Sequence, residues 1–195
     1  WGTGTFVTEA LTQEAIKALD KAKKYNQPFY FYMAHYAIHI PIDKDMRFFP
    51  KYVRKGLSDK EAAYASLIEG MDKSLGDLMD WLEKNGEADN TVIIFMSDNG
   101  GLAAEPGWRD GTIHTQNAPL KSGKGSMYEG GIREPLIVKW PGTVQPDTRN
   151  DKYVIIEDFY PTILEIAGVK DYKTVAPIDG QSFVPMLKQT GDTSK

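Results

Sequence analysis

The amino-acid sequence predicts an α/β fold. Stretches with apolar residues at helical spacing alternate with shorter, nearly continuous apolar runs at residues 29–35, 91–96 and 136–140. Amphipathic helices produce the first pattern, and strands buried in the middle of a sheet produce the second. The predicted order of elements is therefore helix, strand, helix, strand, long loop, strand and helix.

The predicted helices have recognisable ends. Thr12 is expected to cap the first helix, because a threonine hydroxyl can accept a hydrogen bond from a free backbone N–H group. Ser58 and Glu61 form the pattern of a capping box before a second, longer helix. Asn85-Gly86 should end that helix, since a glycine there can adopt the left-handed conformation of a helix C-terminus.

The strands at residues 29–35 and 91–96, joined through the long helix at 59–84, predict a right-handed βαβ unit. A last helix over residues 159–167 is expected to end at Gly168. We expect the chain to be frayed from residue 188 to residue 195.

Composition excludes several classes of protein. At 195 residues and 41% hydrophobic content, the chain is long enough for one domain-sized core. Its 23 basic and 27 acidic residues give a net charge of −4, which argues against a nucleic-acid partner. No apolar run approaches the roughly 20 residues of a membrane span. The absence of cysteine leaves the redox compartment undecided.

A glycine-rich segment surrounds Lys124. Gly123 and Gly125 flank this lysine, and Gly130-Gly131 follow shortly after it. Glycines let the backbone approach a bound group, and a lysine between them can serve as a point charge for a small oxyanion. The alternative is a glycine loop with a solvated lysine. Lys121 is a weaker candidate because glycines do not flank it.

Asp98 and Asn99 follow the strand predicted at residues 91–96. Their carboxylate and amide oxygens are hard donors suited to Ca²⁺ or Mg²⁺. Gly100-Gly101 would allow a sharp exit from the strand, so that both side chains can face one point. Asn-Gly also favours a hairpin turn, but residues 102–112 show no alternating partner strand. We therefore predict a metal site.

Two of the three histidines, His35 and His39, lie at the downstream end of the aromatic strand predicted at residues 29–35. In open α/β sheets, ligands bind at the carboxyl ends of strands. The alternative is two ordinary histidines at a strand edge. The three clusters together would provide an imidazole from His35 or His39, an acidic metal site from Asp98 and Asn99, and a cation from Lys124.

These segments resemble the sulfatases of the alkaline-phosphatase superfamily. The resemblance is carried, in this order, by His39-Ile40-Pro41, Ser97-Asp98-Asn99-Gly100-Gly101, Gly123-Lys124-Gly125 and Tyr128-Glu129-Gly130-Gly131-Ile132-Arg133. It extends over about residues 12–187, and the chain resembles arylsulfatase A-like and polysaccharide sulfatases. It implies a three-layer α/β/α domain with a mainly parallel or mixed central sheet. It also implies sulfated carbohydrates or aryl sulfates as substrates.

The resemblance implies a nucleophile that this chain lacks. Sulfatases use a hydrated formylglycine made from the first residue of a Cys/Ser-x-Pro/Ala-x-Arg motif, and that motif does not occur here. We therefore expect residues 1–195 to be the second half of a catalytic domain, inactive by itself. The first half would supply the nucleophile and two further metal-binding aspartates. The family implies a periplasmic, secreted or lysosomal-type compartment.

The resemblance also assigns roles by motif match. Asp98 and Asn99 match ligands of the family's Ca²⁺ ion, for which Mg²⁺ is the alternative. Lys124 matches the cation at the sulfate oxygens, and His39 matches the histidine that contacts sulfate and supports protonation of the leaving group. His35 is expected to pack or hydrogen-bond behind this histidine. Glu129 and Arg133 are interpreted as structural.

Trp108 and His114 are our candidates for substrate contact. They lie in the long loop over residues 100–122, where an aromatic side chain among polar ones suits the face and hydroxyls of a sugar. Ordinary surface loops have the same composition, so both interpretations stay open.

Two other functions remain as alternatives. A phosphoester or phosphonate hydrolase of the same superfamily would share the metal-bearing sheet and differ in its nucleophile. A non-catalytic carbohydrate-binding or scaffold protein would share the fold alone. The joint presence of the four site residues favours an enzyme: His39, Asp98, Asn99 and Lys124.

Overall fold

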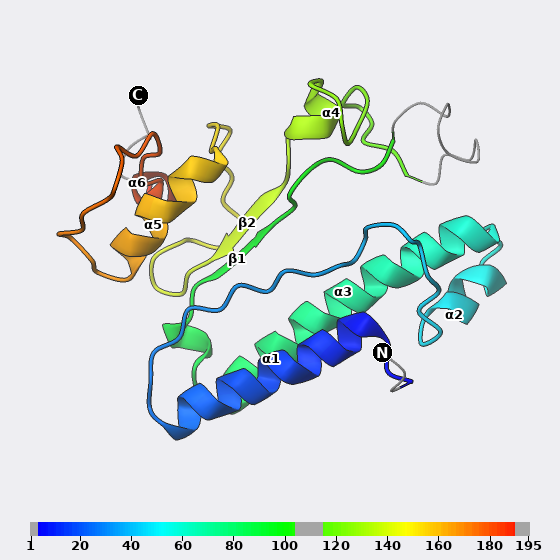
Figure 1. The fold of residues 1–195 in the computed structure, drawn as a ribbon, viewed down its shortest axis with the longest axis horizontal. Helices are drawn as coiled ribbons and strands as arrows, with labels where there is room; N and C mark the ends of the chain where they lie inside the picture. Colours follow the sequence, from blue (N-terminus) through cyan, green and yellow to red (C-terminus); the bar gives the residue numbers. More distant parts are fainter. Residues whose placement is uncertain (1–3, 104–114, 190–195) are drawn as a thin grey trace. The chain divides into compact units, whose positions relative to one another are not determined.

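A computed structural model describes residues 4–103 and 115–189 of the chain (Figure 1). The helices and strands are α1 (Val7–Lys24), α2 (Phe49–Arg54), α3 (Asp59–Lys84), β1 (Ile93–Met96), α4 (Glu129–Ile132), β2 (Leu136–Lys139), α5 (Phe159–Ile166) and α6 (Val184–Leu187). Short 3₁₀ turns lie at Ala88–Asn90 and Ile156–Asp158. This mixture of helix and sheet agrees with the predicted α/β class. No described helix has the length and apolar character needed to cross a membrane.

The chain divides into two compact units. One unit comprises Trp1–Ala88 and Phe95–Ile137, and the other comprises Asp89–Ile94 and Val138–Lys195. The first unit contains α1 to α4 and the loops around them. It therefore carries all of the predicted catalytic and metal-binding residues.

Helix α1 begins at Val7, so the prediction that Thr12 caps it is wrong. Thr12 lies inside the helix and is buried. Its hydroxyl donates a 2.7 Å hydrogen bond to the carbonyl of Thr8, one turn earlier, and lies 2.6 Å from the hydroxyl of Ser74 on α3. The same hydroxyl that can cap a helix can also satisfy a carbonyl within one. Thr12 therefore belongs to the contact between two helices.

Helix α3 has the ends that the sequence predicts. The side chain of Ser58 accepts from the backbone N–H of Glu61, and the carboxylate of Glu61 accepts from the backbone N–H of Ser58. These two bonds complete a capping box. At the other end, Gly86 adopts a left-handed φ of 70° just after the helix. Figure 1 shows α3 alongside α1 in the first unit.

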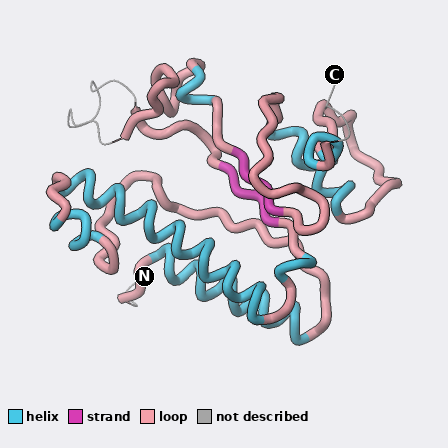
Figure 2. The backbone as a smooth tube through the Cα atoms, turned by 180° about the vertical axis from the view of Figure 1, so that it is seen from behind, coloured by secondary structure: helices cyan, strands magenta, loops and turns pink. Residues whose placement is uncertain are grey.

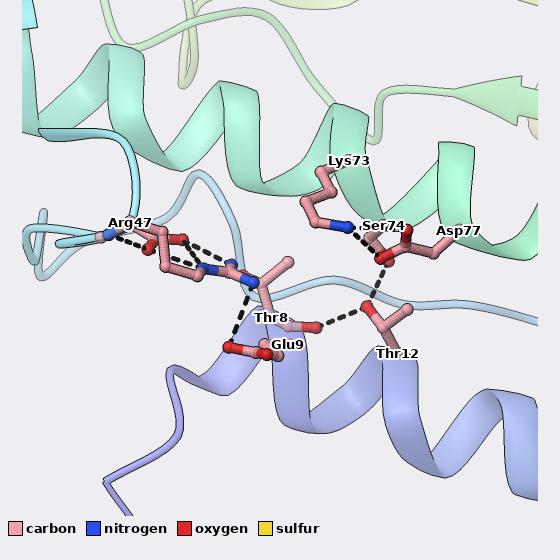
Figure 3. Close-up of polar contacts among 8 residues, drawn as sticks. Thr8, Glu9, Thr12, Arg47, Lys73, Ser74 and Asp77 are labelled. Carbon is pink, nitrogen blue, oxygen red and sulfur yellow. Dashed lines mark hydrogen bonds and ion pairs between the residues drawn. The ribbon is translucent and has the colours of Figure 1, made fainter. Parts of the chain in front are cut away.

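A partly buried ion pair, Asp45 with Arg47, links the segment after His39 to α1 and α3; Figure 3 shows the contact of Arg47 with Glu9 on α1. Asp45 is fully buried, and its carboxylate accepts hydrogen bonds from Arg47 at 2.6 and 2.9 Å. Arg47 also lies 3.2 Å from the carboxylate of Glu9 on α1. The backbone N–H of Asp45 donates to Ser66 on α3 at 3.1 Å. The hydrogen bond with Asp45 raises the pKa of the Arg47 guanidinium, which therefore stays protonated.

Two glycines of α3 lead to predictions of opposite sign. A Cβ atom at Gly70 would lie 2.8 Å from the Asp45 carboxylate, which Arg47 holds in place. We expect Gly70→Ala to destabilise the full-length protein by about 1–3 kcal/mol, the usual cost of overpacking. A Cβ atom at Gly76 would meet no side chain or neighbouring segment of the described residues within 4 Å. Gly76→Ala should therefore stabilise by about 0.5–1 kcal/mol through helix propensity.

Thermal unfolding of the two variants, compared with the unaltered protein, measures both effects. The midpoint should fall for Gly70→Ala and rise for Gly76→Ala. Shifts in the same direction would show that contact with Asp45 does not decide the effect at Gly70.

The predicted strand over residues 29–35 is not formed. These residues belong to no strand of the described chain, and Figure 2 shows this stretch as a loop between α1 and α2. Tyr30, Tyr32 and Tyr36 are 71%, 79% and 70% exposed. A strand requires a neighbour for its backbone hydrogen bonds, and the described residues supply none here. The aromatic pattern is thus present without the pairing that would bury it.

Strands β1 and β2 form a two-stranded sheet, so the predicted runs at 91–96 and 136–140 are strands. Just beyond β1, the N–H of Gly100 donates to the carbonyl of Gly131, which precedes β2. The end of β1 therefore lies beside the start of β2, and the pair is antiparallel. The predicted βαβ unit is wrong, because its first strand, at residues 29–35, is not formed and β1 pairs with β2.

The second unit contains α5 and α6, which a buried aspartate joins. The carboxylate of Asp158 accepts from the backbone N–H groups of Ile155 at 3.0 Å and Gln181 at 2.8 Å. The hydroxyl of Thr162 accepts from the backbone N–H of Phe183 at 2.9 Å. Helix α5 ends before Gly168, which has a left-handed φ of 75°, as the sequence predicts.

Candidate active site

Three glycine-rich segments meet at the end of the β1–β2 sheet. They are the loop after β1 at residues 97–103, the loop at residues 117–126, and the turn that carries α4. The N–H of Lys124 donates to the carbonyl of Gly101 at 3.0 Å, and the N–H of Gly130 donates to the carbonyl of Lys121 at 2.9 Å. Backbone hydrogen bonds therefore join the segment with Asp98 and Asn99 to the segment with Lys124.

Glycine is required where these segments cross. A Cβ atom at Gly100 would lie 1.8 Å from the carbonyl oxygen of Gly130, and one at Gly123 would lie 2.2 Å from the carbonyl oxygen of Gly101. Neither separation is sterically allowed. The glycines that the sequence suggested for contact with a bound group thus have a second use, which is the close packing of one loop on another.

Asp98 and Asn99 offer oxygen atoms to a ligand. Asp98 is exposed, and its carboxylate makes no hydrogen bond or ion pair within the described part of the chain. The amide nitrogen of Asn99 donates to the carbonyl of Gly100 at 3.2 Å, which leaves its amide oxygen for another partner. A carboxylate and an amide oxygen next to each other are a donor set suited to Ca²⁺ or Mg²⁺.

Glu134 is a carboxylate near Asp98 that the sequence did not single out. One of its carboxylate oxygens is buried and has no hydrogen-bond partner among the described residues. Burial, and then the negative charge of Asp98, raise the pKa of the Glu134 carboxyl. Two carboxylates that repel each other at a site with an amide oxygen favour a cation there, so the residues present fit a divalent metal.

These oxygens are not a complete metal site. Across residues 4–103 and 115–189, no three His, Cys, Asp or Glu side chains gather as metal ligands do. A Ca²⁺ ion takes six to eight oxygen ligands. Asp98 and Asn99 can therefore supply only part of a coordination sphere.

Lys124 and Lys121 differ in what they contact. The ammonium of Lys121 lies 3.8 Å from the centre of the Tyr128 ring, in a cation–π contact. The half-buried side chain of Lys124 makes no hydrogen bond or ion pair within the described ranges. Lys124 is thus the lysine of this loop that is available to an anion. Glu129 and Arg133 form an ion pair with each other at 3.1 Å, in line with a structural role.

His39 lies on a turn between α1 and α2. Its Nδ1 atom is 2.9 Å from the carbonyl oxygen of Ile40, and because a carbonyl can only accept, Nδ1 carries the proton. The other ring nitrogen, Nε2, remains for a ligand, and the side chain is exposed. No hydrogen bond or ion pair within the described part of the chain joins His39 to Asp98 or Lys124. Backbone hydrogen bonds thus join two of the three predicted clusters, the loop with Asp98 and Asn99 and the loop with Lys124.

His35 is in a different environment. Its side chain is half-buried, its Nδ1 atom has no hydrogen-bond partner among the described residues, and burial lowers its pKa. A neutral, packed imidazole suits the supporting position that the sequence suggested. The candidates for substrate contact, Trp108 and His114, lie outside the described residues.

Comparison with known proteins gives the relatives of this chain. A family model described as Sulfatase matches residues 3–169. A protein of Formosa agariphila named Sulfatase is 35% identical over 201 residues, covering 96% of this chain and 35% of that protein. The N-acetylgalactosamine-6-sulfatase of Mus musculus is 31% identical over 183 residues, covering 93% of this chain and 33% of that protein. The chain spans about a third of the length of these relatives.

Solved structures agree with this relationship. The crystal structure of Ps i-CgsB in complex with k-i-k-neocarrahexaose matches with a TM-score of 0.85 and 33% identity, covering 96% of this chain and 40% of that chain. The phosphonate monoester hydrolase SpPMH from Silicibacter pomeroyi matches less well, with a TM-score of 0.53 and 26% identity over 70% of this chain and 24% of that chain. The predicted fold class, that of the alkaline-phosphatase-like sulfatases, is thereby confirmed. With a family model that covers most of its length, the chain belongs to the sulfatase family.

Proposed function

We propose that this chain is part of the catalytic domain of a sulfuric ester hydrolase that acts on a sulfated carbohydrate. The observation that carries the proposal is the hydrogen-bonded assembly of two loops, one with Asp98 and Asn99 and the other with Lys124. It supports a site where oxygen ligands for a metal and a fixed cation lie close together. Such a pair of features suits a tetrahedral oxyanion.

In this proposal each residue has a separate task. Asp98 and Asn99 donate oxygens to a Ca²⁺ ion, which would supply positive charge for a sulfate oxygen. Lys124 holds a second positive charge beside the sulfate group, where negative charge shifts as the ester bond breaks. His39 presents Nε2, which in the protonated ring can give its proton to the leaving oxygen. The formylglycine nucleophile would come from outside these 195 residues.

The substrate class is inferred from the relatives. One similar protein was solved with k-i-k-neocarrahexaose, and another is named N-acetylgalactosamine-6-sulfatase. Both descriptions point to carbohydrates, so a sulfated sugar is the substrate we propose, with aryl sulfates as activated substitutes. The likeness to a phosphonate monoester hydrolase supports a second candidate, the hydrolysis of phosphonate or phosphate esters at the same site.

Replacing Asp98 with alanine in the full-length protein tests the proposal. We expect Asp98→Ala to lower both the affinity for Ca²⁺ and the rate of sulfate-ester hydrolysis, with partial rescue by excess Ca²⁺. The reason is that one hard ligand and its charge are lost while the fold remains. Metal content after dialysis and the rate as a function of added Ca²⁺ measure the effect.

Asp80→Ala is the matched control, since Asp80 is an exposed aspartate on α3. It should change neither quantity. Unchanged metal content in Asp98→Ala would show that the Asp-Asn-Gly segment forms a turn and does not bind the metal. Faster hydrolysis of an aryl phosphonate monoester than of the matching aryl sulfate, by the unaltered protein, would favour the second candidate function.

A further inference from the structure

The side chain of Asn117 bridges the two loops of the site. Its amide oxygen accepts a hydrogen bond from the N–H of Gly101 at 3.0 Å. Its amide nitrogen donates to the carbonyl of Gly101 at 3.0 Å and to the carbonyl of Ser122 at 3.0 Å. One half-buried side chain therefore satisfies three backbone groups on two segments.

The positions of these partners link the bridge to the site. Gly101 follows Asn99 by two residues, and Ser122 precedes Lys124 by two residues. The carbonyl of Gly101 also accepts the N–H of Lys124 at 3.0 Å. A shift of Asn117 would therefore move the backbone that carries the lysine relative to the backbone that carries the metal ligands.

Two further features show that the bridge is closely built. A Cβ atom at Gly101 would lie 2.9 Å from the amide oxygen of Asn117, so the glycine is needed for the amide to approach. Ser122 has a φ of 65°, a left-handed conformation that costs energy for a residue with a side chain. Such conformations persist where surrounding contacts hold them, and Asn117 holds the carbonyl of this same residue.

We propose that Asn117 is a positioning residue that sets the location of Lys124 relative to Asp98 and Asn99. The inference rests on the proposed function for its kinetic consequence, although the hydrogen bonds stand without it. An aspartate of the same shape could accept from Gly101, but it would place a negative charge against two carbonyl oxygens and lose both donors. Only an asparagine of this length provides one acceptor and two donors here.

The test compares Asn117→Ala and Asn117→Asp with the unaltered full-length protein. We expect both variants to lower kcat/KM for sulfate-ester hydrolysis by roughly 10- to 100-fold, mainly through kcat, because a small misplacement of a charged group is costly in the transition state. Gln116→Ala is the matched control, since Gln116 is the exposed neighbour in the same loop. It should leave the kinetics unchanged.

A double-mutant cycle with Lys124 separates positioning from general damage. If Asn117 acts through Lys124, then adding Asn117→Ala to Lys124→Ala should cost less than about 3-fold further. A lower thermal midpoint with unchanged kcat, or losses that multiply in full in the double variant, would overturn the inference and leave the proposed function intact.

Binding of inorganic sulfate, measured by calorimetry, provides a readout that needs no turnover. Asn117→Ala and Lys124→Ala should each weaken sulfate binding, and the double variant should be no weaker than Lys124→Ala alone. This pattern in a protein that hydrolyses no sulfate ester would support the positioning role and sink the proposed function. Sulfate binding that is undetectable in the unaltered protein, or equal in all variants, would overturn the positioning role.

Discussion

Replacing Lys124 with alanine is expected to lower kcat/KM for sulfate-ester hydrolysis by roughly 10²-fold or more, the scale for losing one preorganised partner of a developing oxyanion. The side chain is half-buried and makes no hydrogen bond or ion pair among the described residues, so its charge is available to a substrate. Its backbone N–H donates to the carbonyl of Gly101, in the loop that carries Asp98 and Asn99. Steady-state kinetics of the full-length variant on an aryl sulfate and on a sulfated sugar measure the loss.

Lys121→Ala is the matched control for this experiment. Lys121 lies in the same loop and has the same charge, but its ammonium contacts the ring of Tyr128. We expect it to lose far less activity than Lys124→Ala. Equal losses in the two variants would mean that the net charge of the loop matters more than one placed cation, and a Lys124→Ala variant with full activity would remove this lysine from the site.

Replacing His39 with alanine is expected to slow hydrolysis by an amount that depends on the leaving group. A sugar alcohol is a poor leaving group and needs a proton as the ester bond breaks, whereas an acidic phenol needs little help. In the proposed site, Nε2 of the protonated ring would give that proton, because Nδ1 donates to the carbonyl of Ile40. We therefore expect a loss of roughly 10²-fold or more on a sugar sulfate and a smaller loss on an activated aryl sulfate.

The ratio of the two losses is the quantity to measure, with His35→Ala as the comparison. His35 is half-buried, and any loss from its replacement should be the same for both substrates, since it would arise through packing. If His39→Ala loses equally on both substrates, His39 binds sulfate without protonating the leaving group. If it loses nothing on either, the motif match at His39-Ile40-Pro41 has misassigned this residue.

Local chemistry made several elements predictable. The capping box of α3 involves residues three apart, and the left-handed glycines at 86 and 168 follow directly on the helices they end. In each case the interacting residues are close neighbours in the sequence, so a local pattern is enough to predict the helix end. The strands at 93–96 and 136–139 were equally predictable, because each is a short, nearly continuous apolar run in the sequence, although neither strand is fully buried.

Predictions failed where the partner of a residue is distant in the sequence. Thr12 has the chemistry of a helix cap, but its hydroxyl meets Ser74, 62 residues further along. The aromatic run at residues 29–35 has the composition of a buried strand, yet no ladder forms on it within the described chain. Whether such a residue finds a hydrogen-bond partner, or such a segment a neighbouring strand, depends on residues that are distant in the sequence. A local sequence pattern does not identify those neighbours.

The sequence by itself determined the α/β class, the family and the list of residues that could do chemistry, because glycines, carboxylates and a flanked lysine occur in a specific order. Only the tertiary structure decided how these residues are held. It joined the loop with Asp98 and Asn99 to the loop with Lys124 through Asn117, and it partly buried Glu134 near Asp98, so that burial and then the charge of Asp98 raise the pKa of Glu134. Both relationships arise from loops crossing at the end of an antiparallel pair of strands, where the pairing sets which residues become neighbours.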